Sequence, residues 1–211
     1  SWAVRWYYTG QSEIVASSFY SPPLKPGWEH VHQVGPLIRP EVAAAVTQTD
    51  GYLLSYLRAT TPDHVLTALE AADRPVKVYG LGERPFCAIH EYRFVEDLAN
   101  CQAVICAAGN QLLGESLFLG KPVLAIPENQ HHEQCINAHY LQEMGVGEWT
   151  NLEALNPSIV RRFLDRLDDY SQRLSKVRGR LNGTGDAVAI IQDVLSRSSS
   201  AVRPGAKARV A

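Results

Sequence analysis

Residues 102–144 read QAVICAAGNQLLGESLFLGKPVLAIPENQHHEQCINAHYLQEM, and they contain two apolar runs that each precede a segment with helical spacing. The short apolar runs at 102–109 and 122–127 predict buried strands. Helices are predicted over 111–121 and over roughly 132–144. Buried strands that alternate with helices are typical of a parallel sheet covered on both faces. This stretch therefore predicts an α/β fold with a Rossmann-like, doubly wound parallel sheet.

The same alternation extends upstream and downstream of this stretch. Further strands are predicted at 52–58, 75–81 and 86–92, with helices at 61–72 and 94–101 and more helices toward the end of the chain. Thr61 is a plausible N-cap for the helix at 61–72, with Pro62 at its first position. Two extended pieces are expected earlier, at 13–20 and 31–42, because five prolines between residues 22 and 40 favour extended chain over helix.

The composition excludes several classes of protein. The 211 residues are 45% hydrophobic and 20% charged, which is ordinary for a soluble domain, and the net charge of −2 argues against a nucleic-acid binder. No apolar run approaches the ~20 residues that span a bilayer, and no signal peptide is visible. The four cysteines form no CxxC pair, so buried free thiols in a reducing cytoplasm are expected: Cys87, Cys101, Cys106 and Cys135.

Both ends of the chain have a distinct composition. The first ten residues lack an initiator Met and are dense in aromatics, which suggests the interior of a longer protein. Residues 198–211 are predicted to be a disordered, mildly basic tail, and a solvated tail is favoured over a membrane-binding role.

Ligands of open parallel sheets bind beyond the carboxyl ends of the strands, so binding residues are expected at the corners between strands and helices. At the first corner, Thr60 and Thr61 precede a helix whose free N–H groups suit a phosphate, although for Thr61 taken alone an ordinary N-cap is favoured. At the second, HEYRF (90–94), the backbone and the ring of Tyr92 or Phe94 are candidates to flank a base, and a plain strand exit is the alternative.

The third corner, CAAGNQLLGES (106–116), has more features of a binding site. Gly109 ends a strand, Asn110 tolerates turn conformations, and the following helix directs N–H groups outward. Gly114 lies inside that helix, where glycine costs about 1 kcal/mol relative to alanine, so close approach by another group is expected. Glu115 is placed to accept hydrogen bonds from vicinal hydroxyls such as those of a ribose, unless it is simply an acid favoured by the helix dipole.

The fourth corner, ENQHHEQ (128–134), allows three interpretations: a metal site, an acid–base pair, or a site for a polyhydroxylated ligand. A metal is disfavoured because His132 and His139 lie two helical turns apart, about 10 Å along the axis. A nucleophilic triad is also missing around Cys135. Glu133 and Gln134 in the first helical turn suit sugar hydroxyls.

Residues 109–147 resemble the nucleotide-sugar-binding half of GT-B glycosyltransferases, near the MurG-type N-acetylglucosaminyl transferases and the UDP-glucuronosyl or macrolide transferases. The shared pattern is a Gly-containing loop, a Glu in the next helix, Gly-Lys-Pro before a strand, a strand ending in Pro, then Glu-Gln and Asn-Ala. A weaker resemblance runs from about residue 31. The loop here is Ala-Ala-Gly-Asn, without the histidine that many plant and macrolide members carry, so backbone groups would have to bind the phosphates.

The resemblance implies a role for each candidate residue. Gly109 and Asn110 would bind the diphosphate, with Thr60 facing the phosphates and Glu115 on the ribose. Main chain near Glu91 and Tyr92 would meet the base, and Glu133 and Gln134 would hold the donor sugar. The donor-binding set is completed by two neighbours of these residues, Gln111 and His132.

The resemblance also implies a domain organisation. Residues 1–45 would be the end of an N-terminal domain and the interdomain linker, and 46–197 the donor-binding domain. The missing N-terminal domain would bind the acceptor and supply the catalytic base. The implied reaction is inverting transfer of a hexose or N-acetylhexosamine from a nucleotide sugar, with UDP favoured, no metal required, and no turnover by this fragment alone. Membrane association of the longer protein is conceivable but not indicated by this chain.

Three other functions are compatible with the sequence. A UDP-sugar 2-epimerase or a nucleotide-sugar hydrolase has the same fold, and fold does not determine the reaction. A non-catalytic subunit of a split glycosyltransferase is a second alternative. A doubly wound domain for another nucleotide is a third, although the first strand of the alternating series lacks GxGxxG.

Overall fold

The computed structural model describes residues 11–81 and 93–201. For residues 198–201 it describes the backbone but not the side chains. Its main feature is a sheet of five parallel strands, in the spatial order β4 (Val76–Tyr79), β3 (Leu53–Tyr56), β5 (Ala103–Cys106), β6 (Val123–Ala125) and β7 (Gly147–Trp149). Four of these strands confirm sequence predictions. The strand predicted at 86–92 lies outside the described residues.

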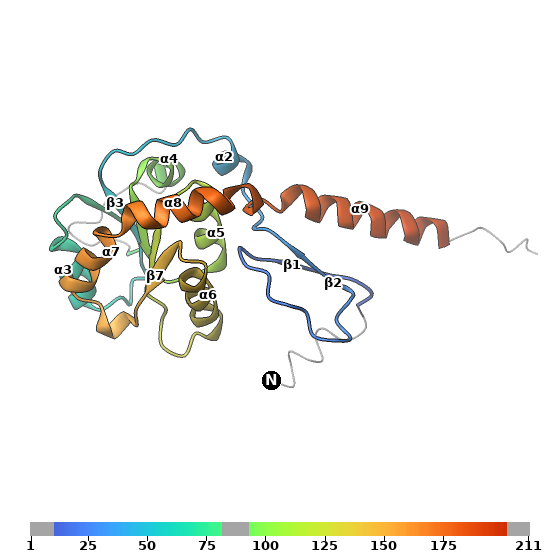
Figure 1. The fold of residues 1–211 in the computed structure, drawn as a ribbon, viewed down its shortest axis with the longest axis horizontal. Coiled ribbons are helices and arrows are strands. Elements are labelled where there is room, and N and C mark those ends of the chain that lie inside the picture. Colours follow the sequence, from blue (N-terminus) through green and yellow to red (C-terminus); the bar gives the residue numbers. More distant parts are fainter. Residues whose placement is uncertain (1–10, 82–92, 202–211) are drawn as a thin grey trace, which may run out of the picture.

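Helices cover both faces of the sheet (Figure 1). Neighbouring strand residues such as Leu53 and Leu54 belong to opposite core clusters, because successive side chains of a strand point to opposite faces. One cluster packs against α3 (Asp63–Glu70) and α7 (Pro157–Leu164); the other packs against α4 (Phe94–Asn100), α5 (Asn110–Phe118) and α6 (His132–Glu143). The doubly wound α/β fold is therefore confirmed.

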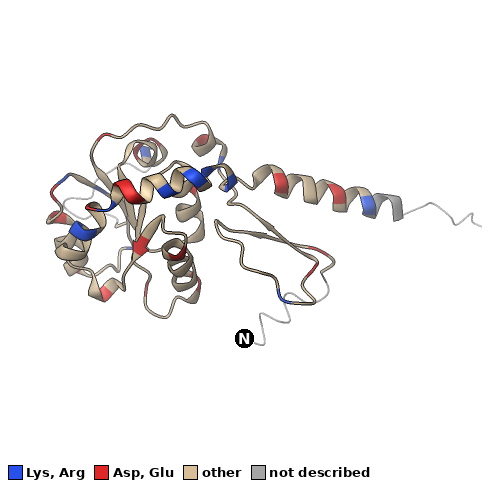
Figure 2. Cartoon of the chain, viewed as in Figure 1, with Lys and Arg blue, Asp and Glu red and all other residues tan. Residues whose placement is uncertain are grey.

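The remaining elements surround this domain. The helix α8 (Leu167–Val177) contributes to both core clusters, and two short 3-10 helices lie at Leu152–Ala154 and Arg178–Arg180. Acidic side chains lie in the first turn of α8 and a lysine in its last turn, which complements the helix dipole. Figure 2 shows acidic and basic residues interspersed over the helices. Within the described residues, no helix combines the length and hydrophobicity needed to cross a membrane.

A second, smaller sheet precedes the main one. It pairs β1 (Ile14–Ser17) with β2 (Val31–Val34) in parallel, and both strands lie within the two extended pieces expected at 13–20 and 31–42. The last helix, α9 (Thr184–Ala201), contacts β2 and extends away from the main domain (Figure 1). The segment after β2 contains a short helix, α2 (Pro40–Ala43), whose buried Val42 joins the main core together with Ile38. The segment expected to be a linker is thus packed onto the sheet domain.

Four local expectations need correction. Thr61 does not cap α3: the helix begins at Asp63 after Pro62, and the Thr61 hydroxyl instead accepts a hydrogen bond from the Arg58 amide at 3.2 Å. Cys135 is exposed, because it lies on the outer face of α6. Residues 40–43 are helical rather than extended, because a proline at the first position is compatible with a helix. The helix α9 continues to Ala201, because adding residues to an existing helix costs little, so residues 198–201 are helical where a tail was expected.

The other two cysteines with described side chains agree with expectation. Cys101 and Cys106 are buried free thiols. Their burial raises the pKa of each thiol to about 12. Both therefore stay protonated and act as small apolar core residues.

Candidate functional site

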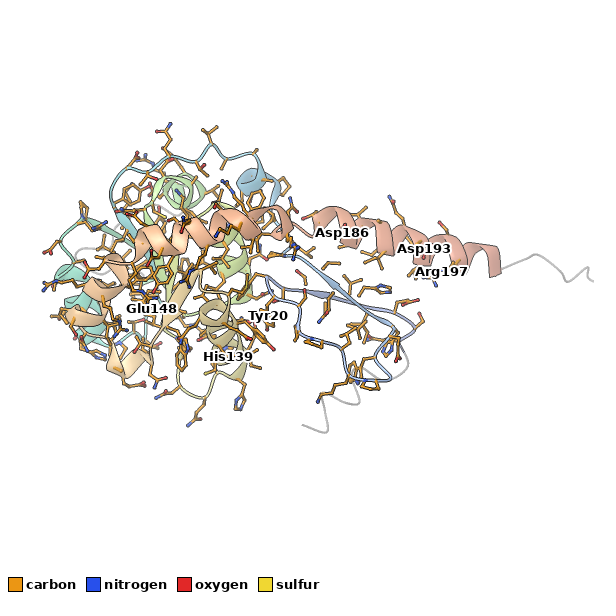
Figure 3. The ribbon with its side chains drawn as sticks, viewed as in Figure 1. Tyr20, His139, Glu148, Asp186, Asp193 and Arg197 are labelled. Carbon is orange, nitrogen blue, oxygen red and sulfur yellow. The ribbon has the colours of Figure 1, made fainter. Side chains whose placement is uncertain are left out.

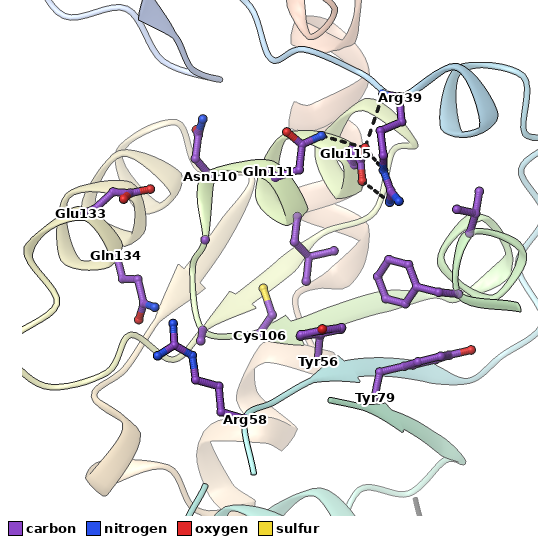
Figure 4. A pocket seen from close by; sticks show the side chains of 15 residues that line it. Arg39, Tyr56, Arg58, Tyr79, Cys106, Asn110, Gln111, Glu115, Glu133 and Gln134 are labelled. Carbon is purple, nitrogen blue, oxygen red and sulfur yellow. Dashed lines mark hydrogen bonds and ion pairs between the residues drawn. The ribbon is translucent and has the colours of Figure 1, made fainter. Parts of the chain in front are cut away.

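A cavity of about 790 Å³ opens at the carboxyl ends of β3, β4 and β5 (Figure 4). The chain runs from β3 outward to β4, and then returns to β5 on the other side of β3. This reversal is the switch point at which open α/β sheets bind ligands. The lining side chains come from the strand ends and the residues that follow them, from the first two turns of α4, α5 and α6, and from the segment before β3: Arg39, Tyr56, Arg58, Tyr79, Phe94, Val95, Cys106, Ala107, Gly109, Asn110, Gln111, Leu112, Glu115, Glu133 and Gln134.

The start of α5 faces this cavity. Gly109 occupies the N-cap position without a side-chain cap, and a Cβ added to it would meet no atom within 4 Å. The preceding Ala108 has φ of 61°, a left-handed conformation that is unfavourable for a non-glycine residue. Helices leave their first N–H groups without partners inside the helix, and those groups attract anions. The loop thus presents backbone donors beside an open space.

The Asn110 side chain lines the cavity and also bonds to the end of the small sheet. Its Nδ2 donates to the Ser17 carbonyl at 3.1 Å, and its Oδ1 accepts from the Ser18 hydroxyl at 3.4 Å. These bonds hold β1 against α5. The backbone of Asn110, at the first turn of α5, is the part that suits an anion.

Glu115 is almost fully buried, with 1% of its side chain exposed. The Arg39 guanidinium donates to both carboxylate oxygens at 2.8 Å, and Gln111 Nε2 donates to Oε1 at 2.8 Å (Figure 4). The bond to Glu115 raises the pKa of Arg39 above its ordinary value, so this arginine stays charged. The close approach expected at Gly114 is confirmed: an added Cβ would lie 2.6 Å from Pro36 Cβ.

The start of α6 contributes Glu133 and Gln134. Glu133 is exposed and lines the cavity, whereas Gln134 is buried and accepts the Glu128 amide at 2.8 Å through its side-chain oxygen. His132 is exposed at the start of α6 and is not among the lining residues. Glu133 and Gln134, both predicted for the donor sugar, therefore line the cavity, whereas His132 does not.

The remaining predicted residues lie elsewhere. Thr60 lines an adjacent cavity of about 210 Å³, which shares Arg58 with the larger one. Glu91 and Tyr92 lie outside the described residues. Phe94, a candidate to flank a base, lines the larger cavity and contacts Tyr56 and Tyr79 edge to face, with ring centroids 5.6 and 5.0 Å apart.

Sequence reasoning missed two arginines of the site. Arg58 lies two residues past the end of β3, and its guanidinium pairs with Glu128 at 3.0 Å. Its place at a strand end was a usable signal, because that is where ligands bind. Arg39 is 76 residues from Glu115 in the chain, so no local pattern connects the two. Among the residues that the structure describes, no three His, Cys, Asp or Glu side chains gather closely enough to hold a metal ion.

The fold is similar to that of solved GT-B glycosyltransferases. The glycotransferase of kitacinnamycin superposes with a TM-score of 0.61 at 18% identity, over 86% of this chain and 54% of that one. The calicheamicin glycosyltransferase CalG4 gives 0.56 at 21% identity, over 81% and 49%. The glycosyltransferase VinC in complex with dTDP gives 0.58 at 14% identity, over 85% and 51%.

The family model described as "Glycosyl transferase family 1" matches residues 4–168 of this chain. The chain therefore belongs to that family. Two curated relatives are uncharacterized glycosyltransferases of methanogens. The Methanosarcina mazei protein is 27% identical over 86% of this chain, and the Methanosarcina acetivorans protein is 26% identical over 51% of it. The matched parts amount to 50% and 31% of those proteins, so the chain spans about half of their length or less.

Proposed function

We propose that this chain is the donor-binding part of a glycosyltransferase and that its ligand is a nucleotide sugar, with UDP as the preferred nucleotide. The observation that carries the proposal is the convergence of three groups on one cavity. These are the start of α5 at Gly109, the carboxylate of Glu115, and Glu133 with Gln134 at the start of α6. The volume of about 790 Å³ lies within the range of ordinary ligand sites, roughly 300–1,000 Å³.

The diphosphate is assigned to the start of α5. Backbone N–H groups at a helix N-terminus bind anions, and the open space at Gly109 lets phosphate approach the backbone. Arg58 adds a cation at the adjoining strand end, and Thr60 lies beside it in the smaller cavity. This positive environment would stabilise the negative charge that develops on the departing diphosphate.

The two ends of the ligand are assigned by the chemistry of the walls. Tyr56, Tyr79 and Phe94 make an aromatic wall suited to a planar base. Glu133 and Gln134 offer acceptors and donors for hydroxyls of the sugar, a hexose or N-acetylhexosamine. Glu115 would accept hydroxyls of the ribose between these ends.

We further propose that transfer inverts the anomeric centre and needs groups beyond this chain. In that reaction a base deprotonates the acceptor hydroxyl, which attacks the anomeric carbon as the nucleoside diphosphate leaves. The relatives extend well past the matched region, which supports an acceptor domain there that carries the base. This chain is then expected to bind donor without turning it over. The buried free thiols Cys101 and Cys106 support a reducing compartment such as the cytoplasm.

Calorimetric titration tests the donor assignment. The ligands are UDP, UDP-N-acetylglucosamine, UDP-glucose and dTDP-glucose without added metal, the last because VinC was solved with dTDP. Wild type is expected to bind UDP. Glu133→Ala is expected to weaken only the sugar conjugates, by about ten- to a hundredfold, since a lost hydrogen bond to a charged group costs roughly 1.5–3 kcal/mol. Glu143→Ala, an exposed acid at the far end of α6, is the matched control. If none of the four ligands bound wild type, the proposal would fail.

A further inference from the structure

Glu115 is inaccessible in the form of the protein seen here. Its side chain is 1% exposed although it lines the cavity, because Arg39 lies over it (Figure 4). Oε1 accepts from Arg39 Nε and Gln111 Nε2, and Oε2 accepts from Arg39 Nη2, each at 2.8 Å. A carboxylate has about four acceptor positions, two on each oxygen. At most one is left, so two vicinal hydroxyls cannot both bind Glu115 while Arg39 stays in place.

The Arg39 side chain, in contrast, has room to move away from Glu115 into solvent. Its side chain is 42% exposed, and its other ion pair, to the exposed Glu41, is long at 3.6 Å. Rotation of this one side chain into solvent would free Oε2, while Oε1 keeps the Gln111 bond and a long bond from the Arg39 amide at 3.5 Å. Arg39 belongs to the segment between the small sheet and the main sheet, outside the helices and strands whose ends form the rest of the cavity wall.

We infer that Arg39 competes with the ribose of the nucleotide for Glu115 and thereby limits donor affinity. The inference rests on the proposed function, since it assigns the ribose hydroxyls to Glu115. When the binding-competent form is a fraction of the population, the apparent dissociation constant rises by the inverse of that fraction. A pair that covers Glu115 in about nine molecules of ten would weaken binding about tenfold.

The test compares UDP with 2′,3′-dideoxy-UDP by calorimetry on wild type and Arg39→Ala. The variant is expected to bind UDP about tenfold more tightly and the dideoxy analogue with unchanged affinity, because only the hydroxyls compete with Arg39. In a Glu115→Gln background, Arg39→Ala is expected to give no gain. Arg39→Lys keeps the charge but loses the bidentate contact, so an intermediate gain is expected, and this variant serves if the alanine variant fails to fold.

The matched control is Arg58→Ala, which removes a cation from the same cavity without uncovering Glu115. It is expected to weaken both ligands. Weaker UDP binding by Arg39→Ala would overturn the inference, because Arg39 would then be a ligand contact. An equal gain for UDP and the dideoxy analogue would overturn it as well, because the effect would not involve the hydroxyls. Either result, with UDP bound by wild type, leaves the proposed function standing, whereas absence of UDP binding throughout would refute both.

Discussion

Single residues determine how closely the segment before β3 approaches the candidate site. Pro36 packs onto α5 where Gly114 lacks a side chain, and three residues later Arg39 reaches Glu115. The glycine is therefore a contact requirement of the fold. The ion pair between the neighbouring Glu115 and Arg39 depends on that contact, because Pro36 and Arg39 belong to the same segment.

Gly114→Ala is expected to destabilise the protein by about 1–3 kcal/mol, because Pro36 or α5 must shift to admit the new methyl group. Urea unfolding measures the difference. Gly185→Ala is the matched control, since Gly185 is also helical but has open space around its Cβ position. The control is expected to be unchanged or more stable by up to about 1 kcal/mol. Equal stability of wild type and Gly114→Ala would contradict the packing described here.

For single residues, the sequence predicts the local structure well where a residue type has few structural roles. A glycine inside a helix predicted close approach correctly, although it did not identify Pro36 as the partner. Thr61 was misassigned because a threonine before a proline can close a turn as well as cap a helix. The Arg39–Glu115 pair was not predictable, because it joins side chains that are brought together only by the tertiary fold.

At the scale of elements, a buried hydrogen-bonded network holds the edge of the main sheet. Asp97 of α4 accepts Lys77 Nζ on one oxygen and the Tyr79 hydroxyl on the other, each at 2.6 Å. The Tyr52 hydroxyl donates to the Asp97 carbonyl at 2.8 Å. Burial alone would raise the pKa of Asp97, but the bonds from Lys77 and Tyr79 outweigh it and lower the pKa. The network fixes β4 and α4, two of the elements that line the cavity.

Asp97→Asn is expected to lower the free energy of unfolding at pH 7 by about 2–3 kcal/mol, because a charged acceptor of two hydrogen bonds is lost. Because the folded pKa of Asp97 lies below its ordinary value of 3.8, its stabilisation is present above that pH and is lost as the pH falls through the folded pKa. The gap between wild type and variant should therefore persist from pH 7 to about pH 4 and close below it.

Denaturant titrations at several pH values measure this gap. Glu96→Gln is the control, since Glu96 lies on the same helix and its ion pair with Arg93 is exposed. It is expected to change stability by less than about 0.5 kcal/mol. A gap for Asp97→Asn that is already absent at pH 5 would be inconsistent with a carboxylate held in its charged form.

Element by element, the strongly apolar strands and the helices between them were predictable, and β7 was not. Its three residues, Gly147–Trp149, are too few to show a period. The strand exists because of its partners: it pairs with β6, and its buried Glu148 binds Arg162, Arg166 and Tyr170. Burial, and then the nearby Glu148, raise the pKa of Tyr170 to about 12, so its hydroxyl remains a donor.

At the scale of the whole molecule, the small sheet is joined to the main domain next to the candidate site. Tyr20 lies just after β1 and points toward α6 (Figure 3). Its ring stacks on Tyr140 of α6 with ring centroids 4.0 Å apart, and its hydroxyl donates to Asn137 Oδ1 at 3.1 Å. Asn137 in turn donates to the Ala108 carbonyl at 3.0 Å, in the loop before α5. The contact therefore links β1, α6 and the α5 loop.

Tyr20→Ala is expected to destabilise the chain by about 2–4 kcal/mol and to speed proteolytic cleavage around β1 and β2, because the stacked ring and the hydroxyl are both lost. Tyr20→Phe keeps the ring and should cost only about 1 kcal/mol. Limited proteolysis with mass mapping, beside thermal unfolding, measures both effects. Cleavage of Tyr20→Ala at the wild-type rate would mean that the small sheet is held by other contacts.

The central claim is that the cavity at the carboxyl ends of β3, β4 and β5 binds the nucleotide. Hydrogen–deuterium exchange of the chain with and without saturating UDP tests it most directly, because the readout locates the ligand. Binding is expected to slow exchange in residues 106–116 and at the start of α6. No protection there, or protection confined to the separate cavity of about 690 Å³ beside Tyr20 and His139, would contradict the claim.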